Sequence, residues 1–259
     1  MTAMIKDTNV PGGDVRAANV TFYFVNGTTL TPIGSAKNLP VGLVDVTNGS
    51  VGTASAIVQL NIGSANAQSF QIAVGITGGY TNNPFDALSE NVVTVAKPIP
   101  GGFIVGGGEL VNTAATTGLI KGAVGQPTDF SFNVQYNKSQ TNPQGKAFFT
   151  IRSYYKSNGT LDSSLHTYIV STSAIALLAV TVPTASFSSK ANVDELLSNG
   201  TVVSVEGGAT LLMSMNGVTN TLAITVQRKA GGLWYSSNFN SATGKTVEQA
   251  ISAGDVSVN

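Results

Sequence analysis

The strongest structural signal is the run from Asp129 to Tyr155, DFSFNVQYNKSQTNPQGKAFFTIRSYY. Its first part alternates large apolar residues with polar ones, which places the apolar side chains on one face of a strand. A polar stretch with Pro143 and Gly145 then turns the chain, and Ala147 to Tyr155 returns as a second strand. The sequence therefore predicts the central hairpin of an all-β domain, with Phe132, Val134, Phe149 and Ile151 in its core.

The segment before this hairpin reads as a series of short strands separated by turn residues. Predicted strands recur about every ten residues between residues 15 and 97, which is typical of an immunoglobulin-like sandwich. Residues 1–14 are expected to be a leader or linker, because Pro11 and two glycines follow a stretch without a strong pattern. The expected strands are Val20–Val25, Leu30–Ile33, Leu39–Val46, Thr53–Ile62, Ser69–Ile76 and Asn91–Ala96.

A second domain is expected over residues 98–259. Lys97-Pro98-Ile99-Pro100-Gly101-Gly102 is the best boundary, since prolines stiffen a linker and glycines end the preceding pattern. Beyond it the chain again reads almost entirely as short strands, with Gly106–Gly108 expected to separate the first two. Thr246–Ile251 is the exception, because its capping-box spacing predicts one or two helical turns. The fold class is thus all-β, two β-sandwich domains in series, the first immunoglobulin-like.

The composition excludes several functional classes. Of 259 residues only 10 % are charged, and 13 Lys and Arg balance 13 Asp and Glu. A nucleic-acid-binding protein needs a clustered basic surface, whereas these cations are scattered singly. The longest apolar run, Ala174–Val182, is about half of what a membrane-spanning helix requires. Cysteine is absent, which excludes disulfides and thiolate chemistry. A low-charge chain rich in Thr, Asn and Gly favours an extracellular or cell-surface location.

The order of the motifs resembles a known architecture. In the second domain the resemblance is carried by the runs GGFIVGGG, DFSFNVQYNKS, NPQGKAFFTIRS, VEGGATLLMSM, TLAITVQRKAGGLWYSS and KTVEQAISAGDVSV. They are similar to the Gly-rich β-sandwich module at the C-terminal end of large modular bacterial and archaeal surface proteins. Residues 15–97 resemble the immunoglobulin-like repeat that precedes it there, through LPVGLVDV and GTASAIVQLNIGSANAQSFQIAVGI. The resemblance implies a structural or adhesive role and supplies no catalytic residues.

Few residues offer chemistry. His166 is the only histidine, so a His-based triad or a multi-histidine metal site cannot form within one chain. Carboxylates are sparse, and Asp86 and Glu90 are the best of a weak set of calcium ligands, because calcium needs six to eight oxygens. No cofactor other than calcium is expected, and no catalytic residue is predicted.

Aromatic side chains suggest one binding activity. Trp234 and Tyr235, together with Tyr154 and Tyr155, are candidates to stack on sugar rings if they share an exposed sheet face. The competing interpretation is that Trp234 is a core residue, and this interpretation is preferred.

The sequence therefore favours a non-enzymatic structural or adhesive module of an extracellular surface, scaffold or fibre protein. Two alternatives remain open: a carbohydrate-binding module, and a self-assembling filament or virion subunit that pairs through an edge strand. The expected partners are other extracellular proteins or copies of this chain, and polysaccharide under the first alternative.

Overall fold

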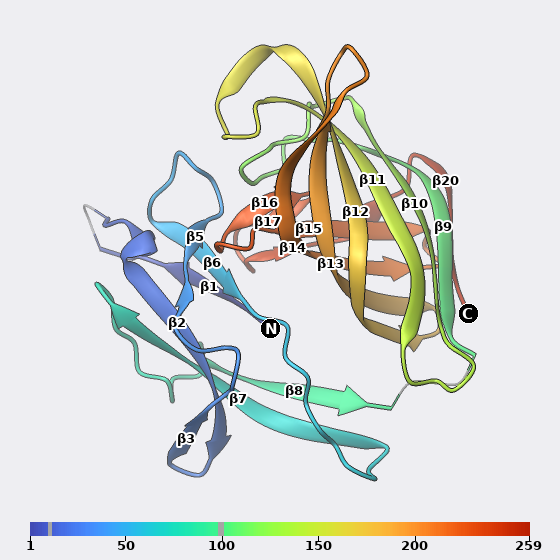
Figure 1. The fold of residues 1–259 in the computed structure, drawn as a ribbon. Helices are drawn as coiled ribbons and strands as arrows, with labels where there is room; N and C mark the ends of the chain where they lie inside the picture. The colour runs from blue at the N-terminus through green and yellow to red at the C-terminus, as the bar shows by residue number, and fades with distance from the viewer. Residues whose placement is uncertain (10–11, 98–100) are drawn as a thin grey trace. The chain divides into compact units, whose positions relative to one another are not determined.

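The computed structural model describes residues 1–9, 12–97 and 101–259. The chain forms two compact units, the first made of Met1–Lys97 with Ala230–Gly232, and the second of Pro98–Lys229 with Leu233–Asn259. Both units are built from β-strands, and a three-residue 3₁₀ turn at Val15–Ala17 is the only helical element among the described residues (Figure 1). The all-β prediction is confirmed. Pro98–Pro100, the middle of the expected boundary, lies outside the described residues.

Unit 1 is a sandwich of two sheets. Across the described residues, one sheet has the order β1-β6-β5 and the other β3-β2-β7-β8, with β4 beside β2. Both sheets contribute to one core, which includes Ile5 of β1, Phe22 of β2 and Ile72 of β7. The strands are β1 (Thr2–Lys6), β2 (Ala18–Asn26), β3 (Thr29–Pro32), β4 (Leu39–Pro40), β5 (Gly42–Leu43), β6 (Val51–Ser55), β7 (Ala67–Gly78) and β8 (Glu90–Ala96).

The N-terminal segment corrects the prediction of a leader or linker over residues 1–14. Thr2–Lys6 forms β1, which pairs antiparallel with β6, and Ile5 is buried in the core. Ile5 and the partly buried Ala3 face the core from one side of β1, and the ladder with β6 fixes the segment. One large and one small apolar side chain on that side, in five residues, form too weak an alternation to predict a strand. The expected strands at 39–46 and 53–62 are also shorter, since only Leu39–Pro40, Gly42–Leu43 and Val51–Ser55 are paired.

Unit 2 is one large curled sheet whose inner face encloses the core. Across the described residues it is 10-stranded, with the order β16-β15-β14-β13-β12-β11-β10-β9-β20 and β19 beside β15. From β9 to β16 each strand pairs with the next along the chain, so the sheet is an antiparallel meander. Register shifts interrupt four of these pairings, and such bulges increase the local twist that lets a sheet curl.

The strands of unit 2 differ from the predicted elements in two places. They are β9 (Phe103–Val111), β10 (Pro127–Tyr136), β11 (Pro143–Tyr155), β12 (Leu161–Thr181), β13 (Thr184–Leu196), β14 (Val202–Asn216), β15 (Thr221–Gln227), β16 (Leu233–Ser236), β17 (Phe239–Asn240), β18 (Lys245–Thr246), β19 (Gln249–Ala250) and β20 (Ala253–Val258). The predicted helix at Thr246–Ile251 is wrong, because its first residue ends β18 and Gln249–Ala250 form β19, which pairs with β15. The expected break at Gly106–Gly108 is also absent, because β9 is a single continuous strand.

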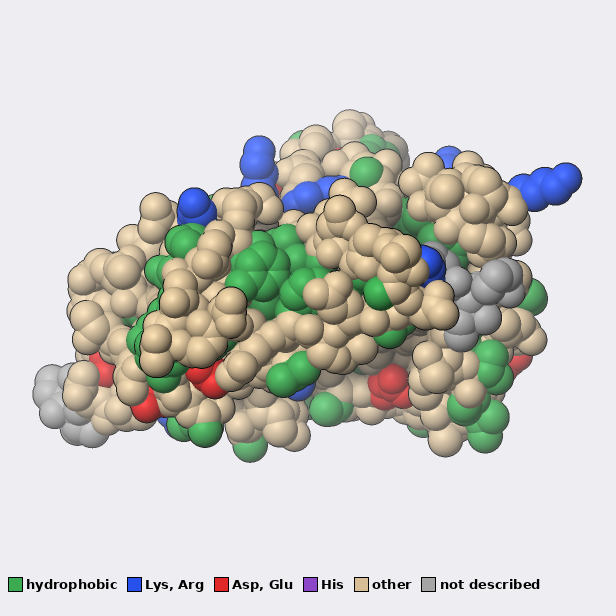
Figure 2. Space-filling model, turned by 90° about the horizontal axis from the view of Figure 1, so that it is seen from below, with side chains coloured by type: hydrophobic (Ala, Val, Ile, Leu, Met, Phe, Trp, Pro, Cys, Tyr) green, Lys and Arg blue, Asp and Glu red, His purple; other side chains and the backbone are tan. Residues whose placement is uncertain are grey.

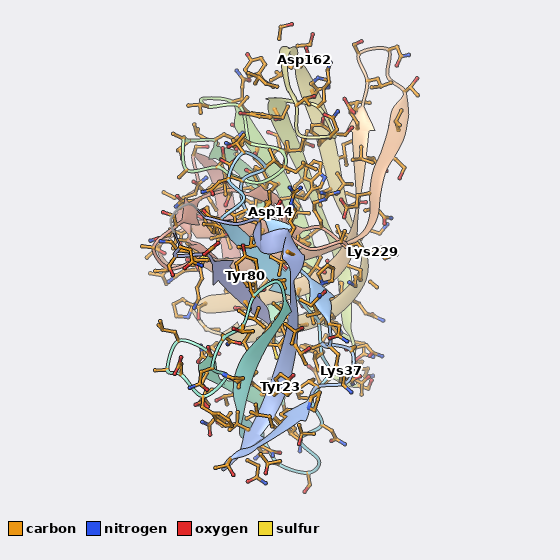
Figure 3. All side chains as sticks on the ribbon, turned by 90° about the vertical axis from the view of Figure 1, so that its left-hand side faces the viewer. Asp14, Tyr23, Lys37, Tyr80, Asp162 and Lys229 are labelled. Carbon is orange, nitrogen blue, oxygen red and sulfur yellow. The ribbon has the colours of Figure 1, made fainter. Side chains whose placement is uncertain are left out.

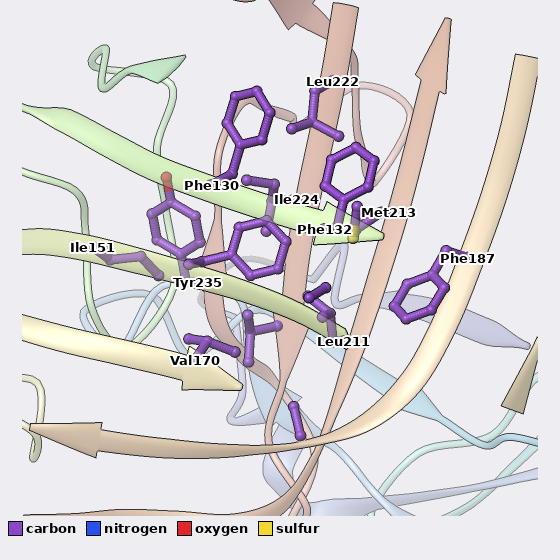
Figure 4. Close-up of a cluster of buried hydrophobic side chains, with 14 of the residues drawn as sticks. Phe130, Phe132, Ile151, Val170, Phe187, Leu211, Met213, Leu222, Ile224 and Tyr235 are labelled. Carbon is purple, nitrogen blue, oxygen red and sulfur yellow. The ribbon is translucent and has the colours of Figure 1, made fainter. Parts of the chain in front are cut away.

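The central hairpin is the best-predicted part of the molecule. β10 and β11 pair from Thr128 opposite Ile151 to Tyr136 opposite Pro143. Phe132, Val134, Phe149 and Ile151 are all buried, as the alternation predicts. Their side chains lie among those of β12 to β15 in one continuous cluster, in which the labelled residues of Figure 4 point toward one another.

The glycines of β9 explain why it is one strand rather than two. Gly106 lies opposite Phe132, whose ring occupies the space that a side chain there would need. A Cβ on Gly106 would come within 2.6 Å of the Phe132 ring. A Cβ on Gly108 would instead meet the backbone of Ala253 on β20. Gly106–Gly108 is therefore a packing feature of a continuous strand and not a turn.

Candidate functional site

The four aromatic residues predicted to stack on sugars do not form one exposed face. Trp234 and Tyr235 of β16 are fully buried in the unit 2 core. Tyr154 is 42 % exposed, whereas Tyr155, its neighbour on β11, packs partly against the core. Tyr154 therefore faces solvent while Tyr155 packs partly against the core, so the two tyrosines do not form one exposed stacking surface. The stacking prediction is thus wrong for Trp234 and Tyr235, and the core interpretation of Trp234 is confirmed.

The buried side chain of Tyr235 belongs to a polar network instead. Its hydroxyl donates to Oδ1 of Asn112 at 2.9 Å and lies 3.1 Å from the Thr128 hydroxyl. The Thr128 hydroxyl also donates to Oδ1 of Asn112, at 2.9 Å. Burial strongly raises the pKa of Tyr235, which keeps the phenol neutral. The network joins β10 and β16 to the segment after β9, and so cross-links strands far apart in the sheet order.

The predicted calcium ligands lie near the β7–β8 turn, where each carboxylate accepts a hydrogen bond from a side-chain amide. The Asp86 carboxylate accepts a hydrogen bond from the side-chain amide of Asn83 at 3.0 Å. Glu90 accepts one from the Gln71 amide on β7, at 2.9 Å. Within residues 1–9, 12–97 and 101–259, no three His, Asp or Glu side chains gather in an arrangement suited to a metal ion. The structure therefore gives no support to calcium at Asp86 and Glu90.

The densest group of titratable side chains surrounds His166 on β12. Its Nδ1 lies 2.6 Å from Oε1 of Glu195 on β13, and its Nε2 lies 3.0 Å from Oδ2 of Asp162. Lys156 adds a cation 3.5 Å from the same oxygen of Asp162. Figure 3 labels Asp162 at the start of β12, at one end of the sheet in unit 2.

These contacts determine the charge state of the cluster. Burial lowers the pKa of His166, but the hydrogen bonds that its ring donates to Glu195 and Asp162, together with the negative charges of those carboxylates, outweigh burial and raise the pKa above its usual 6.5. Hydrogen bonding to His166, together with the Ser163 backbone and Lys156, lowers the pKa of Asp162 to about 2. Because both ring nitrogens of His166 are hydrogen-bonded to carboxylate oxygens, the ring has no free nitrogen for proton transfer to a substrate. The cluster is suited to holding β13 to the start of β12.

Sequence reasoning missed this cluster because its members are far apart in the chain. His166 and Asp162 are four residues apart, but Glu195 is brought to them only by the pairing of β12 with β13, in which Tyr168 lies opposite Glu195. The one available signal was a lone histidine on a predicted strand with acidic residues on two neighbouring strands. Without the register, that signal could not be distinguished from an ordinary surface residue.

The exposed surface offers no extended charged area on the face shown in Figure 2, where Lys and Arg side chains stand singly among polar ones. Within the described residues, no helix combines the length and hydropathy needed to cross a membrane.

No family model, curated protein or solved structure matches this chain. The likeness to modular surface proteins accordingly stays a prediction from the sequence.

Proposed function

We propose that this chain is a structural module of an extracellular surface, scaffold or fibre protein, without catalytic activity of its own. The observation that carries the proposal is that His166 and the Tyr235 hydroxyl are hydrogen-bonded to other side chains of unit 2. His166 bonds Glu195 on the neighbouring strand β13 through Nδ1 and Asp162 on its own strand through Nε2, and the Tyr235 hydroxyl is bonded inside the core. The ring nitrogens of His166 and the hydroxyl of Tyr235 are thus engaged in hydrogen bonds within unit 2.

The long paired strands support the same role. β12 alone runs for 21 residues, and it is paired on both sides by β11 and β13. Antiparallel ladders of this length distribute strain over many main-chain hydrogen bonds, which suits a module that transmits force or spans distance. The two compact units in series, each with its own core, fit a chain of repeated modules.

The location can be tested with a single introduced cysteine, because the natural chain has none. Val218 lies in the β14–β15 turn and is 79 % exposed, so Val218→Cys should leave the fold intact. We expect a membrane-impermeant maleimide to label this variant on the intact cells or particles that produce it, while the cysteine-free parent gives no signal. Labelling only after lysis would contradict an extracellular role.

The absence of catalysis needs a separate test. Purified protein should not turn over polysaccharide, ester or peptide substrates, with or without calcium. Turnover that is lost when one Asp or Glu is replaced would refute the proposal and would locate the catalytic carboxylate.

A further inference from the structure

We propose that two copies of this chain pair through the outer edge of β8, antiparallel and about a two-fold axis. This inference rests on the proposed structural function and names the partner and the surface. β8 (Glu90–Ala96) is the last strand of its sheet and has β7 as its one neighbour among the described residues. A strand in this position presents main-chain donors and acceptors to a further strand.

The register with β7 shows which groups face outward. The Val74 N–H donates to the Ser89 carbonyl, and the Lys97 N–H donates to the Asn66 carbonyl, so odd-numbered residues of β8 face β7. Because hydrogen-bonding direction alternates in an antiparallel pair, the N–H and C=O groups of Val92, Thr94 and Ala96 point away from β7. The Val92 N–H meets the side chain of its neighbour Asn91 at 2.8 Å, a local bond that a partner carbonyl would replace.

Other sheet edges in the described residues carry the protection that β8 lacks. In unit 2, Leu119 and Ile120 donate to the carbonyls of β16, covering one edge. The other edge, β20, is covered by the Asn220 side chain, which donates to the Gly254 carbonyl and accepts from the Val256 N–H.

The edges of unit 1 other than β8 are protected by their length and composition. β3 has four residues and ends in proline, β5 has two residues, and β1 is five residues long and ends in Lys6. β8 has seven residues, ENVVTVA, with no proline, no lysine and Val92 61 % exposed. Short strands, prolines and lysines are the usual means of blocking edge pairing, so β8 stands out as an edge available for pairing.

The sequence of β8 favours a second copy as its partner. In an antiparallel pair centred on Thr94, each Thr94 lies opposite its equivalent, Val92 lies opposite Ala96, and Val93 lies opposite Val95. β-branched residues then meet on both faces, which is the arrangement that stabilises paired strands. Such a pairing is isologous and closes as a dimer.

Charge selects the same orientation. The strand begins with Glu90 and is followed by Lys97, so its ends carry opposite charges. Antiparallel pairing brings the acidic end of each strand to the basic end of the other, whereas parallel pairing would set like charges together.

The first test is the mass of the purified full-length chain as a function of concentration, by light scattering or sedimentation. We expect a monomer–dimer equilibrium, and we expect Val92→Lys to weaken it by about tenfold or more, because an edge lysine opposes pairing. Val218→Lys, an equally apolar-to-charged change in unit 2, should leave the equilibrium unchanged. Far-ultraviolet circular dichroism verifies that both variants are folded.

The second test is a cross-link that reports the register. Two Thr94 residues opposite each other have Cα atoms about 5.5 Å apart, which a disulfide can bridge. Oxidation of Thr94→Cys should give covalent dimers as the main product, well above the background set by Val218→Cys.

Several results would overturn the inference: a wild type that stays monomeric, a dimer that Val92→Lys does not weaken, or cross-linking of Thr94→Cys no greater than background. A monomer that instead captures an unrelated extended peptide at β8 would also refute a second copy as the partner. None of these outcomes bears on the location measured by maleimide labelling, so the proposed function and the edge inference can fail separately.

Discussion

The close fit between Phe132 and Gly106 offers the sharpest test of how unit 2 is packed. Phe132 is 2 % exposed, and its neighbours across β9 and β11 are the small residues Gly106 and Ala147. A Cβ at Gly106 would lie 2.6 Å from Cζ of the Phe132 ring and 3.0 Å from the Asp255 carbonyl oxygen. The ring therefore fills the space that the missing side chain leaves, and each residue requires the other.

The magnitudes follow from this geometry. Phe132→Ala leaves a cavity in a packed core and should cost about 3–5 kcal/mol of the free energy of unfolding. Gly106→Ala forces the ring aside and should cost about 1–3 kcal/mol in the wild type. In the Phe132→Ala background the ring is absent and only the Asp255 carbonyl remains close. The double variant should therefore be more stable than the sum of the single changes by about 1–2 kcal/mol.

Trp234 makes this measurement specific to unit 2. It is the only tryptophan, and it is buried in the same cluster as Phe132. Urea unfolding followed by tryptophan fluorescence thus reports the unfolding of unit 2, whatever unit 1 does. It gives the free energy of unfolding of the wild type, of the two single variants and of the double variant. A cost below about 1 kcal/mol for Phe132→Ala, or an equal cost of Gly106→Ala in both backgrounds, would refute the packing argument.

The same fluorescence assay checks three further predictions. Gly254→Ala should destabilise unit 2 clearly more than Gly200→Ala: both glycines have φ in the left-handed region, at 95° and 82°, but only a Cβ at Gly254 would meet the backbone of β9. Equal costs would show that backbone conformation alone matters there. Tyr235→Phe should cost about 1–3 kcal/mol because it removes a buried hydrogen-bonded hydroxyl, whereas Tyr154→Phe at an exposed site should change stability by less than about 0.5 kcal/mol; a neutral Tyr235→Phe would contradict a role for the network. Because the folded state raises the pKa of His166, its stabilising charge is present below pH 6.5 and is lost as the pH rises through the folded-state pKa. As the pH rises above 6.5, the free energy of unfolding of the wild type should accordingly fall more steeply than that of His166→Gln, and parallel curves would contradict the ion-pair interpretation.

The features that the sequence predicted well are those that depend on local alternation. Phe130 to Tyr136 alternate strongly, so the strand, its buried face and its hairpin partner follow from period and turn residues alone. Trp234 sits in an apolar run on a predicted strand, and its core position follows from the preference of large aromatics for burial.

The features that the sequence did not predict depend on pairing between distant strands. Gly106–Gly108 is expected to be a break because glycine is disfavoured in strands. Once the strands are adjacent, however, the Phe132 ring of β10 leaves no room for a side chain at Gly106, and the backbone of β20 leaves none at Gly108. Thr246–Ile251 has helical capping spacing, and pairing of Leu222 with Gln249 overrides it. The cluster of His166 with Glu195 exists only because β12 and β13 are in one particular register.

The most direct test of a structural role for two self-sufficient β-units is to stretch one full-length molecule between its ends by single-molecule force spectroscopy. A module built for mechanical continuity, with one core in each unit, should resist extension and then yield in two discrete events. The shorter event should release the 97 residues of the N-terminal segment, which extend to roughly 330 Å at about 3.4 Å per residue. A single event that releases the whole chain, or gradual extension without a resisting step, would contradict this role.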